Sequence, residues 1–268
     1  MNLYSWENGV ALLLAFVVMY IVDTMGDKLN RHQVNFAFSM RKLGVLIGSG
    51  IAFIAPVTDM GEGDFVNNLI NFGFSSLIII IFIFLSMIIN DKILLKDIDN
   101  NKMLRDNNIS VAVVEAGTFI ATGIILFASI SGEGVWWSSI MFFVLGQLAF
   151  ILLVYLYNMT AKFDIYDLVK KGNISIAIVL AGIMISAAII LKSAIIGDNT
   201  TLLNDLKIFG IDLVITVIFV VFILNIVIDK IFMPETKIYD EIVNDHVPNA
   251  IIYSSIKIAL AFVIAAVI

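Results

Sequence analysis

The chain has no cysteine, so it forms no disulfide framework, offers no thiolate zinc site and carries no cysteine nucleophile. Charge is also scarce. Asp, Glu, Lys and Arg make up 14% of the 268 residues, against about 25% in an ordinary soluble domain. The formal net charge is -6, and the scattered lysines leave no basic face for nucleic acid. Apolar residues make up 60% of the chain and its mean hydropathy is +1.02, which indicates an integral membrane protein.

Eight apolar stretches are long enough to cross a membrane as helices. The hydrocarbon core is about 30 Å thick and takes roughly 20 residues to cross at 1.5 Å per residue. The predicted spans cover about residues 6–23, 36–57, 67–90, 109–130, 136–158, 174–196, 208–229 and 247–268. We therefore expect an all-α, polytopic bundle of eight transmembrane helices, with the lipid bilayer as its surroundings.

The connections between these spans alternate in charge. Thirteen of the 16 Lys and Arg residues lie in or beside the first, third, fifth and seventh connections, among them Lys92, Arg105 and Lys171. The positive-inside rule places these connections in the cytoplasm and both termini outside. The three Trp residues then lie at the outer interface, as an aromatic belt requires.

Small residues recur at fixed positions in every second span. We number these spans from Asn35, Asn108, Asn173 and His246 as position zero. Position nine is held by Gly44, Gly117, Gly182 and Ser255, and position fifteen by Gly50, Gly123, Ala188 and Ala261. Small residues are common in membrane helices generally, but their concentration in alternate spans favours close packing of these helices on one another.

The recurrence predicts four repeated helical hairpins, grouped into two four-helix halves at residues 1–133 and 134–268. The even-numbered spans should pack inside, and the bulkier odd-numbered spans should face lipid. In the cytoplasmic connections, apolar residues such as Ile98, Met103 and Leu104 alternate with charges. They suit either short amphipathic helices at the headgroups or solvated linkers.

Ionisable side chains inside the spans are costly and mark either a site or a structural contact. Glu115 lies seven residues beyond Asn108, in a span without a basic residue. Several polar side chains lie on a common face of their own span: Asn108, Glu115, Thr118 and Thr122 in the fourth, Ser39, Lys42 and Ser49 in the second, and Tyr253 and Lys257 in the eighth. We expect Glu115 to pair with Lys42, at the same repeat position, or with Lys257, one turn deeper.

Two interpretations of these stripes stay open. In the first, the ion pair and hydroxyls form a structural lock that fixes which helix faces which. In the second, they line a polar passage in which Glu115 is a cation or proton site. Asn108 and Asn173 have a simpler explanation as helix N-caps, because Asn accepts a free backbone N–H there.

Two segments carry a family resemblance: NISVAVVEAGTFIATGIIL from Asn108 and NISIAIVLAGIMISAAIIL from Asn173. They resemble the Asn-plus-small-residue signature of the YjfL-like bacterial membrane proteins, the domain of unknown function 350. That domain is similar to a four-helix unit, and two copies would cover nearly the whole chain. The resemblance implies a multi-pass protein of the bacterial inner membrane and an association with envelope stress, without implying a substrate or catalytic residues. The chain departs from the pattern at His246, which replaces the Asn, and at the charged Arg41 and Lys42.

No catalytic motif, nucleotide-binding loop or paired metal-ligand pattern is present, so we expect neither an enzyme nor a cofactor nor a metal site. The first functional hypothesis is a channel or transporter for a small ion or solute, through a polar seam between the even-numbered spans. Duplicated hairpins favour it, whereas the parallel orientation of the two halves, and the lack of a span clearly broken at mid-membrane, weaken the case for alternating access. The alternative is a non-conducting scaffold linked to envelope stress, which docks a partner through its cytoplasmic linkers. A homo-oligomer and a cytoplasmic stress-response protein are the open partner hypotheses.

Overall fold

The computed structural model describes residues 6–29, 34–60, 64–95, 98–131, 136–161, 163–196 and 201–268. Within these ranges the regular structure is entirely helical. Eight helices are long and apolar enough to cross a membrane: Trp6–Met25, Phe36–Asp59, Phe65–Leu94, Ile109–Ser131, Trp137–Thr160, Ile174–Ile195, Leu202–Phe232 and Val247–Ala265. The predicted all-α bundle of eight membrane-length helices is therefore confirmed.

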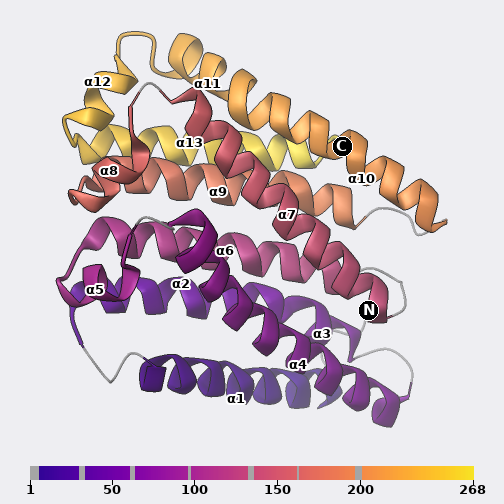
Figure 1. The fold of residues 1–268 in the computed structure, drawn as a ribbon. Helices are drawn as coiled ribbons and strands as arrows, with labels where there is room; N and C mark the ends of the chain where they lie inside the picture. The colour runs from indigo at the N-terminus through magenta and orange to yellow at the C-terminus, as the bar shows by residue number, and fades with distance from the viewer. Residues whose placement is uncertain are drawn as a thin grey trace.

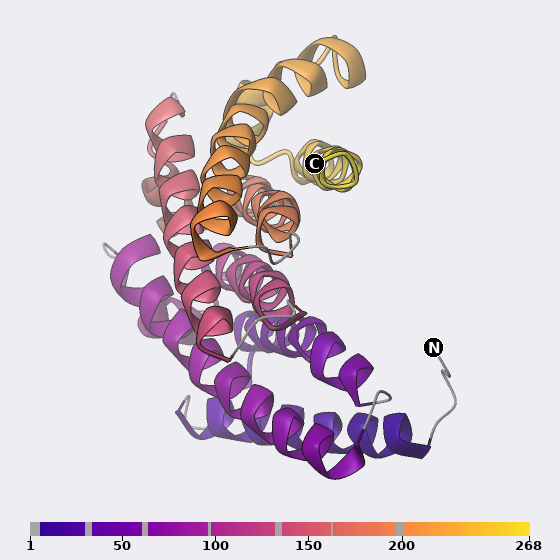
Figure 2. The same cartoon turned by 90° about the vertical axis from the view of Figure 1, so that its right-hand side faces the viewer.

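Four of these helices form a single row in which each helix packs on the next. In order they are α2 (Phe36–Ala52), α6 (Ile109–Ser131), α9 (Ile174–Ile195) and α13 (Val247–Ala265). Figures 1 and 2 show this row running side by side from indigo α2 to yellow α13. The middle helices α6 and α9 are buried along most of their length, whereas α2 and α13 at the two ends keep exposed faces.

A second layer covers one side of the row. It consists of α4 (Phe65–Ile89), α7 (Trp136–Thr160) and α10 (Leu202–Val217), which cross the row helices in both views (Figures 1 and 2). Bulky side chains such as Ile81, Leu148 and Val214 are exposed on these helices, as contact with acyl chains requires. The bulky helices thus do not surround the row. Because successive connections are built alike, each connecting helix falls on the same side.

The remaining long helix, α1 (Trp6–Leu29), lies at the α2 end of the row. It contacts α2, α4 and the short helix α3 (Ile54–Asp59), which continues the second span after a break at Phe53. This break lies beyond the middle of the second span, which runs from Phe36 to Asp59. Helix α1 therefore closes the beginning of the row.

The seventh span is also irregular. After α10 it passes through a π-helical segment η2 (Ile218–Ile223), one turn of α-helix α11 (Leu224–Val227) and a second π segment η3 (Ile228–Phe232). The Asn225 side chain donates a 2.7 Å hydrogen bond to the Val221 carbonyl oxygen, four residues earlier. A side chain that takes up such a carbonyl competes with the backbone ladder of the helix, which accounts for the changed winding at this point.

Three short helices gather at one end of the row, at the left in Figure 1. They are α5 (Asn100–Arg105), α8 (Ile165–Lys170) and α12 (Ile238–Val243), and each precedes the next row helix. Each buries one apolar side chain near its end: Leu104, Val169 or Ile242. These segments of the predicted cytoplasmic connections are therefore folded as helices.

Candidate functional site

Contacts between row helices repeat in one register. A Cβ atom placed on Gly44 would lie 2.3 Å from the Ala116 Cα atom. One placed on Gly117 would lie 2.6 Å from the Ala181 Cβ, and one on Gly182 would lie 2.6 Å from the Ser254 Cβ. In each case position nine of one helix meets position eight of the next. Only glycine allows this separation, because any side chain would overlap the neighbouring helix.

The remaining small residues of positions nine and fifteen fall into two groups: some are buried between row helices, and others lie on the outermost helices of the row. Gly123 lies against Gly48, where an added Cβ would stand 2.1 Å from the Gly48 carbonyl oxygen, and Ala188 and Ala261 are fully buried. Gly50 and Ser255 lie outside the contacts between row helices. A Cβ on Gly50 would meet the Met19 side chain of α1 at 3.6 Å, and Ser255 is exposed on α13. Gly50 lies at the α2 end and Ser255 at the α13 end of the row that the described helices form.

Glu115 forms a buried ion pair with Arg41. The Arg41 Nε atom lies 2.8 Å from the Glu115 Oε2 atom, and the two residues are 7% and 1% exposed. The expected pairing with Lys42 or Lys257 is therefore replaced by a pair between neighbouring residues of α2 and α6. Lys42 lies two residues before Gly44, about 200° around the helix, so it points away from α6. Arg41 lies three residues before Gly44, about 60° away, and reaches the carboxylate.

The two lysines have partners of their own. The Lys42 Nζ atom lies 3.0 Å from the Asp23 Oδ2 atom of α1. The Lys257 Nζ atom, fully buried, donates a 2.6 Å hydrogen bond to Asn225 Oδ1 in α11, and the Tyr253 hydroxyl donates to the same oxygen at 2.6 Å. The Lys257 ammonium also lies 5.3 Å from the centroid of the Tyr157 ring in α7, within the range of a cation–π contact.

The predicted polar stripe of α6 contacts three different neighbours. Glu115 faces α2, whereas the Thr118 hydroxyl lies 3.4 Å from the Met184 sulfur of α9. Thr122 accepts a 3.4 Å hydrogen bond from Gln147 of α7. On α2, the Ser39 and Ser49 hydroxyls donate to backbone carbonyls of their own helix. The predicted side chains thus do not converge on a common surface.

The ionic contacts are divided between the two ends of the row. Arg41, Glu115 and Lys42 belong to the α1, α2 and α6 end, and Lys257 belongs to the α7, α11 and α13 end. Helix α9 stands between them and carries the buried, apolar Leu180 at the repeat position of Glu115. Among the described residues, the Arg41–Glu115 cluster and the Lys257–Asn225 cluster are therefore separate from one another.

The row helices are tied to one another by their first Asn. Asn35, Asn108 and Asn173 each accept the backbone N–H three residues later, at 2.8, 3.0 and 2.8 Å. The same side chains donate forward, to the carbonyl oxygens of Leu104, Lys170 and Ile242 at 2.7, 3.2 and 2.9 Å. Each amide thus caps its own helix and binds the last turn of the short helix before the next row helix. We call this contact the Asn clamp.

The clamp explains the departure at His246. Within the described residues, α13 is the last helix, and the His246 side chain bonds backward rather than forward. His246 instead pairs through its Nδ1 atom with Glu241. The sequence predicts the N-capping half of the Asn contacts, but the donation to a residue about 70 positions away becomes visible only with the fold.

The residue before the clamp position also connects neighbouring repeats. Asn107 and Asp245 have left-handed backbone angles, with φ of 57° and 60°, and Gly172 has φ of 88° at the equivalent point. The Asn107 side chain accepts a 3.0 Å hydrogen bond from the Ala37 N–H of the preceding row helix, and Asp245 accepts one of 2.7 Å from Ser175 N–H. Asn, Asp and Gly are the residues that tolerate this conformation best. Their recurrence before α6, α9 and α13 is a sequence signal for this turn, and two of the three residues, Asn107 and Asp245, also make the side-chain contact.

We expect Asn173→Ala to lower the free energy of unfolding by about 2 kcal/mol or more, because it removes a cap worth about 1 kcal/mol and leaves buried carbonyls without a donor. His246→Ala, at the same repeat position, is the control. It should lower the free energy of unfolding clearly less, since His246 is bonded within its own repeat. Thermal unfolding of both variants in one detergent checks this. Equal losses would show that the forward donation has no energetic role.

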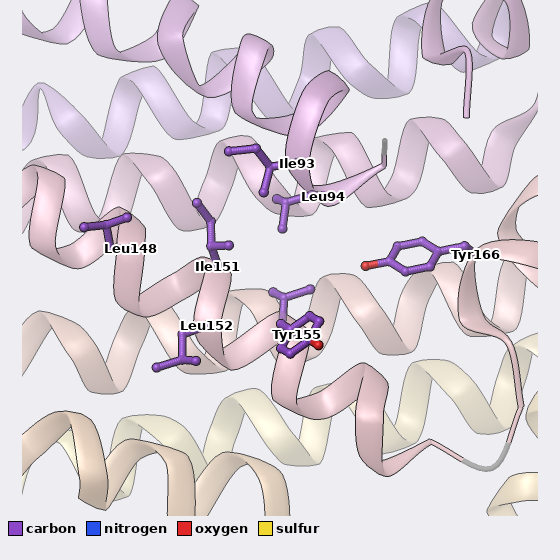
Figure 3. A pocket seen from close by; sticks show the side chains of 8 residues that line it. Ile93, Leu94, Leu148, Ile151, Leu152, Tyr155 and Tyr166 are labelled. Carbon is purple, nitrogen blue, oxygen red and sulfur yellow. The ribbon is translucent and has the colours of Figure 1, made fainter. Parts of the chain in front are cut away.

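A hollow of about 300 Å³ lies near the predicted cytoplasmic ends of α4 and α7 (Figure 3). Its lining is aliphatic apart from two tyrosines: Ile93, Leu94, Leu148, Ile151, Leu152, Val154, Tyr155 and Tyr166. None of the paired charges lines it. In the part of the chain that the structure describes, no group of three or more His, Asp and Glu side chains is placed to hold a metal ion. The hollow therefore suits an acyl chain better than an ion.

In the comparison with known proteins, one family model matches the chain twice. The family model described as Domain of Unknown Function (DUF350) matches residues 3–130 and, separately, residues 132–268. The two matches follow one another and together cover nearly the whole chain. No curated protein and no solved structure matches it.

Proposed function

This chain belongs to the DUF350 family, which it contains as two tandem copies, and we propose that the copies build a non-conducting scaffold in the bacterial inner membrane. The observation that carries the proposal is the closure of the seams between row helices. A water molecule needs a cavity about 2.8 Å across. Backbone and Cβ atoms of neighbouring helices stand closer than that to the Cβ positions of Gly44, Gly117 and Gly182, which leaves no passage along these contacts.

The paired charges also favour a lock over a conducting site. A cation that passed Glu115 would have to displace the Arg41 guanidinium, which lies 2.8 Å from the carboxylate in a buried position. A passage for ions would also need polar groups that follow one another along a single path across the membrane. The polar residues of α6 instead contact α2, α9 and α7 separately.

The surface that would serve a partner is the predicted cytoplasmic end of the row. The Asn clamps hold α5, α8 and α12 at a fixed spacing, because each is bonded to the preceding row helix. Charged side chains are exposed on all three short helices, including Lys102, Arg105, Lys170 and Asp240. A rigid array of charged helices suits docking of a cytoplasmic protein, and the family resemblance favours an envelope-stress protein as that partner.

The alternative function is a channel or transporter for a small ion or solute. One observation favours it: the seventh span turns π-helical beside Asn225, which accepts hydrogen bonds from Lys257 and Tyr253. Irregular helices with polar contacts at mid-span are common at functional sites in membrane transporters. The two functions predict opposite results in a flux assay.

Liposomes containing the purified protein test the proposal with H⁺, Na⁺ and K⁺ as probes. The scaffold predicts flux no faster than through empty liposomes, and Glu115→Gln should reduce the amount of folded protein. Wild-type flux that is lost in a folded Glu115→Gln protein would instead establish conduction. For the docking face, a photo-cross-linking amino acid at Arg105 should capture a cytoplasmic protein in cells. The same amino acid at Trp137, on the predicted outer side, is the matched control and should not.

A further inference from the structure

The row helices share a surface that faces the next helix, formed by positions nine, thirteen, sixteen and twenty of the repeat. These positions lie within about 60° of one another on an α-helix. We call this surface the forward face. It consists of Gly44, Gly48, Ile51 and Ala55 in the second span, of Gly117, Ala121, Ile124 and Ala128 in α6, and of Gly182, Ser186, Ile189 and Ser193 in α9.

In these three spans the forward face is covered by the next row helix. The three glycines at position nine contact Ala116, Ala181 and Ser254, as described above. At position twenty, the Ser193 hydroxyl donates a 2.8 Å hydrogen bond to the Ala265 carbonyl oxygen of α13. The forward face is therefore a contact surface that this chain uses three times.

The fourth copy of the surface is exposed. On α13 it consists of Ser255, Ala259, Phe262 and Ala266, all of which are exposed, Phe262 at 60%. Ser255 and Ala259 keep the spacing of four that lets two helices approach closely. On α6 and α9, by contrast, the half-buried residues Val113, Ile120, Ile178 and Ile185 are all bulky. The exposed forward face of α13 thus has the composition of a helix contact.

The opposite end of the row does not offer a matching surface. At position eight, where the later row helices carry Ala116, Ala181 and Ser254, α2 carries Leu43, which is 48% exposed. Helix α1 lies beside it, with Met19 against Gly50. A second chain therefore cannot extend the row by placing its α2 on α13. Close packing there needs a small residue and an open face on α2, but Leu43 occupies the contact position and α1 lies beside it.

We propose that the forward face of α13 binds the same face of a second copy of this chain, which gives a two-fold symmetric dimer. Both copies have the same orientation in the membrane, so the two α13 helices run parallel about an axis along the membrane normal. An isologous contact of this kind closes on itself and leaves no free end. Close backbone approach and the Ser255 hydroxyl supply the attraction, since lipid provides no hydrophobic force between helices.

Cysteine cross-linking tests the dimer in native membranes, and the chain's lack of cysteine makes each introduced thiol the only one. We expect Ser255→Cys and Ala259→Cys to yield, on oxidation, a species of twice 29.6 kDa. A disulfide forms only where the two Cα atoms come within about 7 Å. Phe222→Cys, which is equally exposed in a π-helical part of the seventh span, is the control and should remain monomeric.

Three results would overturn the proposal. The first is the absence of a cross-linked dimer for both cysteines on α13. The second is a ladder of larger species from the double variant Leu43→Cys/Ser255→Cys, which would show a row that grows head to tail. The third is an unchanged mass for Ala259→Leu in light scattering, where we expect a two-fold decrease. Ala259 is exposed in the single chain, so this variant should stay folded, and none of these results depends on whether the protein conducts ions.

Discussion

Gly117→Leu is expected to abolish folded protein. A Cβ atom at this position would stand 2.6 Å from the Ala181 Cβ and 2.7 Å from the Ala181 Cα. These atoms belong to the backbone region of α9, which is itself packed against α13, so they cannot move aside as a flexible side chain would. Overpacking an ordinary core costs about 1–3 kcal/mol and occasionally more. A leucine within a backbone contact should exceed that range, and the yield of monodisperse protein after gel filtration measures the result.

Two glycines of the second layer provide matched controls. A Cβ atom on Gly73 in α4 or on Gly210 in α10 would meet no atom within 4 Å. Gly73→Leu and Gly210→Leu should therefore give a normal yield of folded protein, because both side chains would extend into open space. A Gly117→Leu protein that folds as well as these two variants would mean that α6 and α9 do not touch at this point.

Glu115→Leu is expected to destabilise the protein by about 3–5 kcal/mol, because it removes the carboxylate that the buried Arg41 guanidinium binds at 2.8 Å. Arg41→Met/Glu115→Leu should recover most of that loss, since a buried ion pair can often be replaced by apolar side chains at little cost. Arg105→Met, which removes an exposed arginine, is the control and should change the unfolding midpoint little. Thermal unfolding of these variants in one detergent gives the comparison.

The Arg41→Met/Glu115→Leu variant distinguishes an ion pair that only stabilises the fold from one that is needed for function. A structural lock predicts that the doubly apolar protein is folded and retains any partner binding. If the single variant Glu115→Leu unfolded at the wild-type midpoint, the Arg41–Glu115 ion pair would not contribute to the stability of the protein.

Much of the architecture follows directly from the sequence. The spans are visible because each is a stretch of roughly 20 predominantly apolar residues, the length that crosses the hydrocarbon core as a helix. The division into two layers is visible because glycine and alanine recur in alternate spans, and close approach of helices depends on that property. The side of the row on which the bulky helices lie is not visible, because helix order alone does not determine handedness.

The polar contacts were less predictable. Repeat numbering equates Glu115 with Lys42, but repeat position does not show which side of α2 faces α6, and that side is marked by Gly44. Consecutive residues differ by about 100° around a helix, so Arg41 lies about 60° from Gly44 and reaches Glu115, whereas Lys42 lies about 200° from Gly44 and does not. Asn225 was also missed as the partner of Lys257, because the π-helical turns beside it rotate the seventh span away from regular periodicity.

Accessibility of the seam to water tests the closed packing most directly. In open membrane fragments, a charged, water-soluble methanethiosulfonate reagent should modify Ser39→Cys, at an exposed position of α2. It should leave Thr118→Cys and Thr122→Cys unmodified, since these positions are 1% and 0% exposed within α6. Modification of Thr118→Cys at a rate like that of Ser39→Cys would show that water reaches the seam, and it would contradict a row of helices closed by backbone contact.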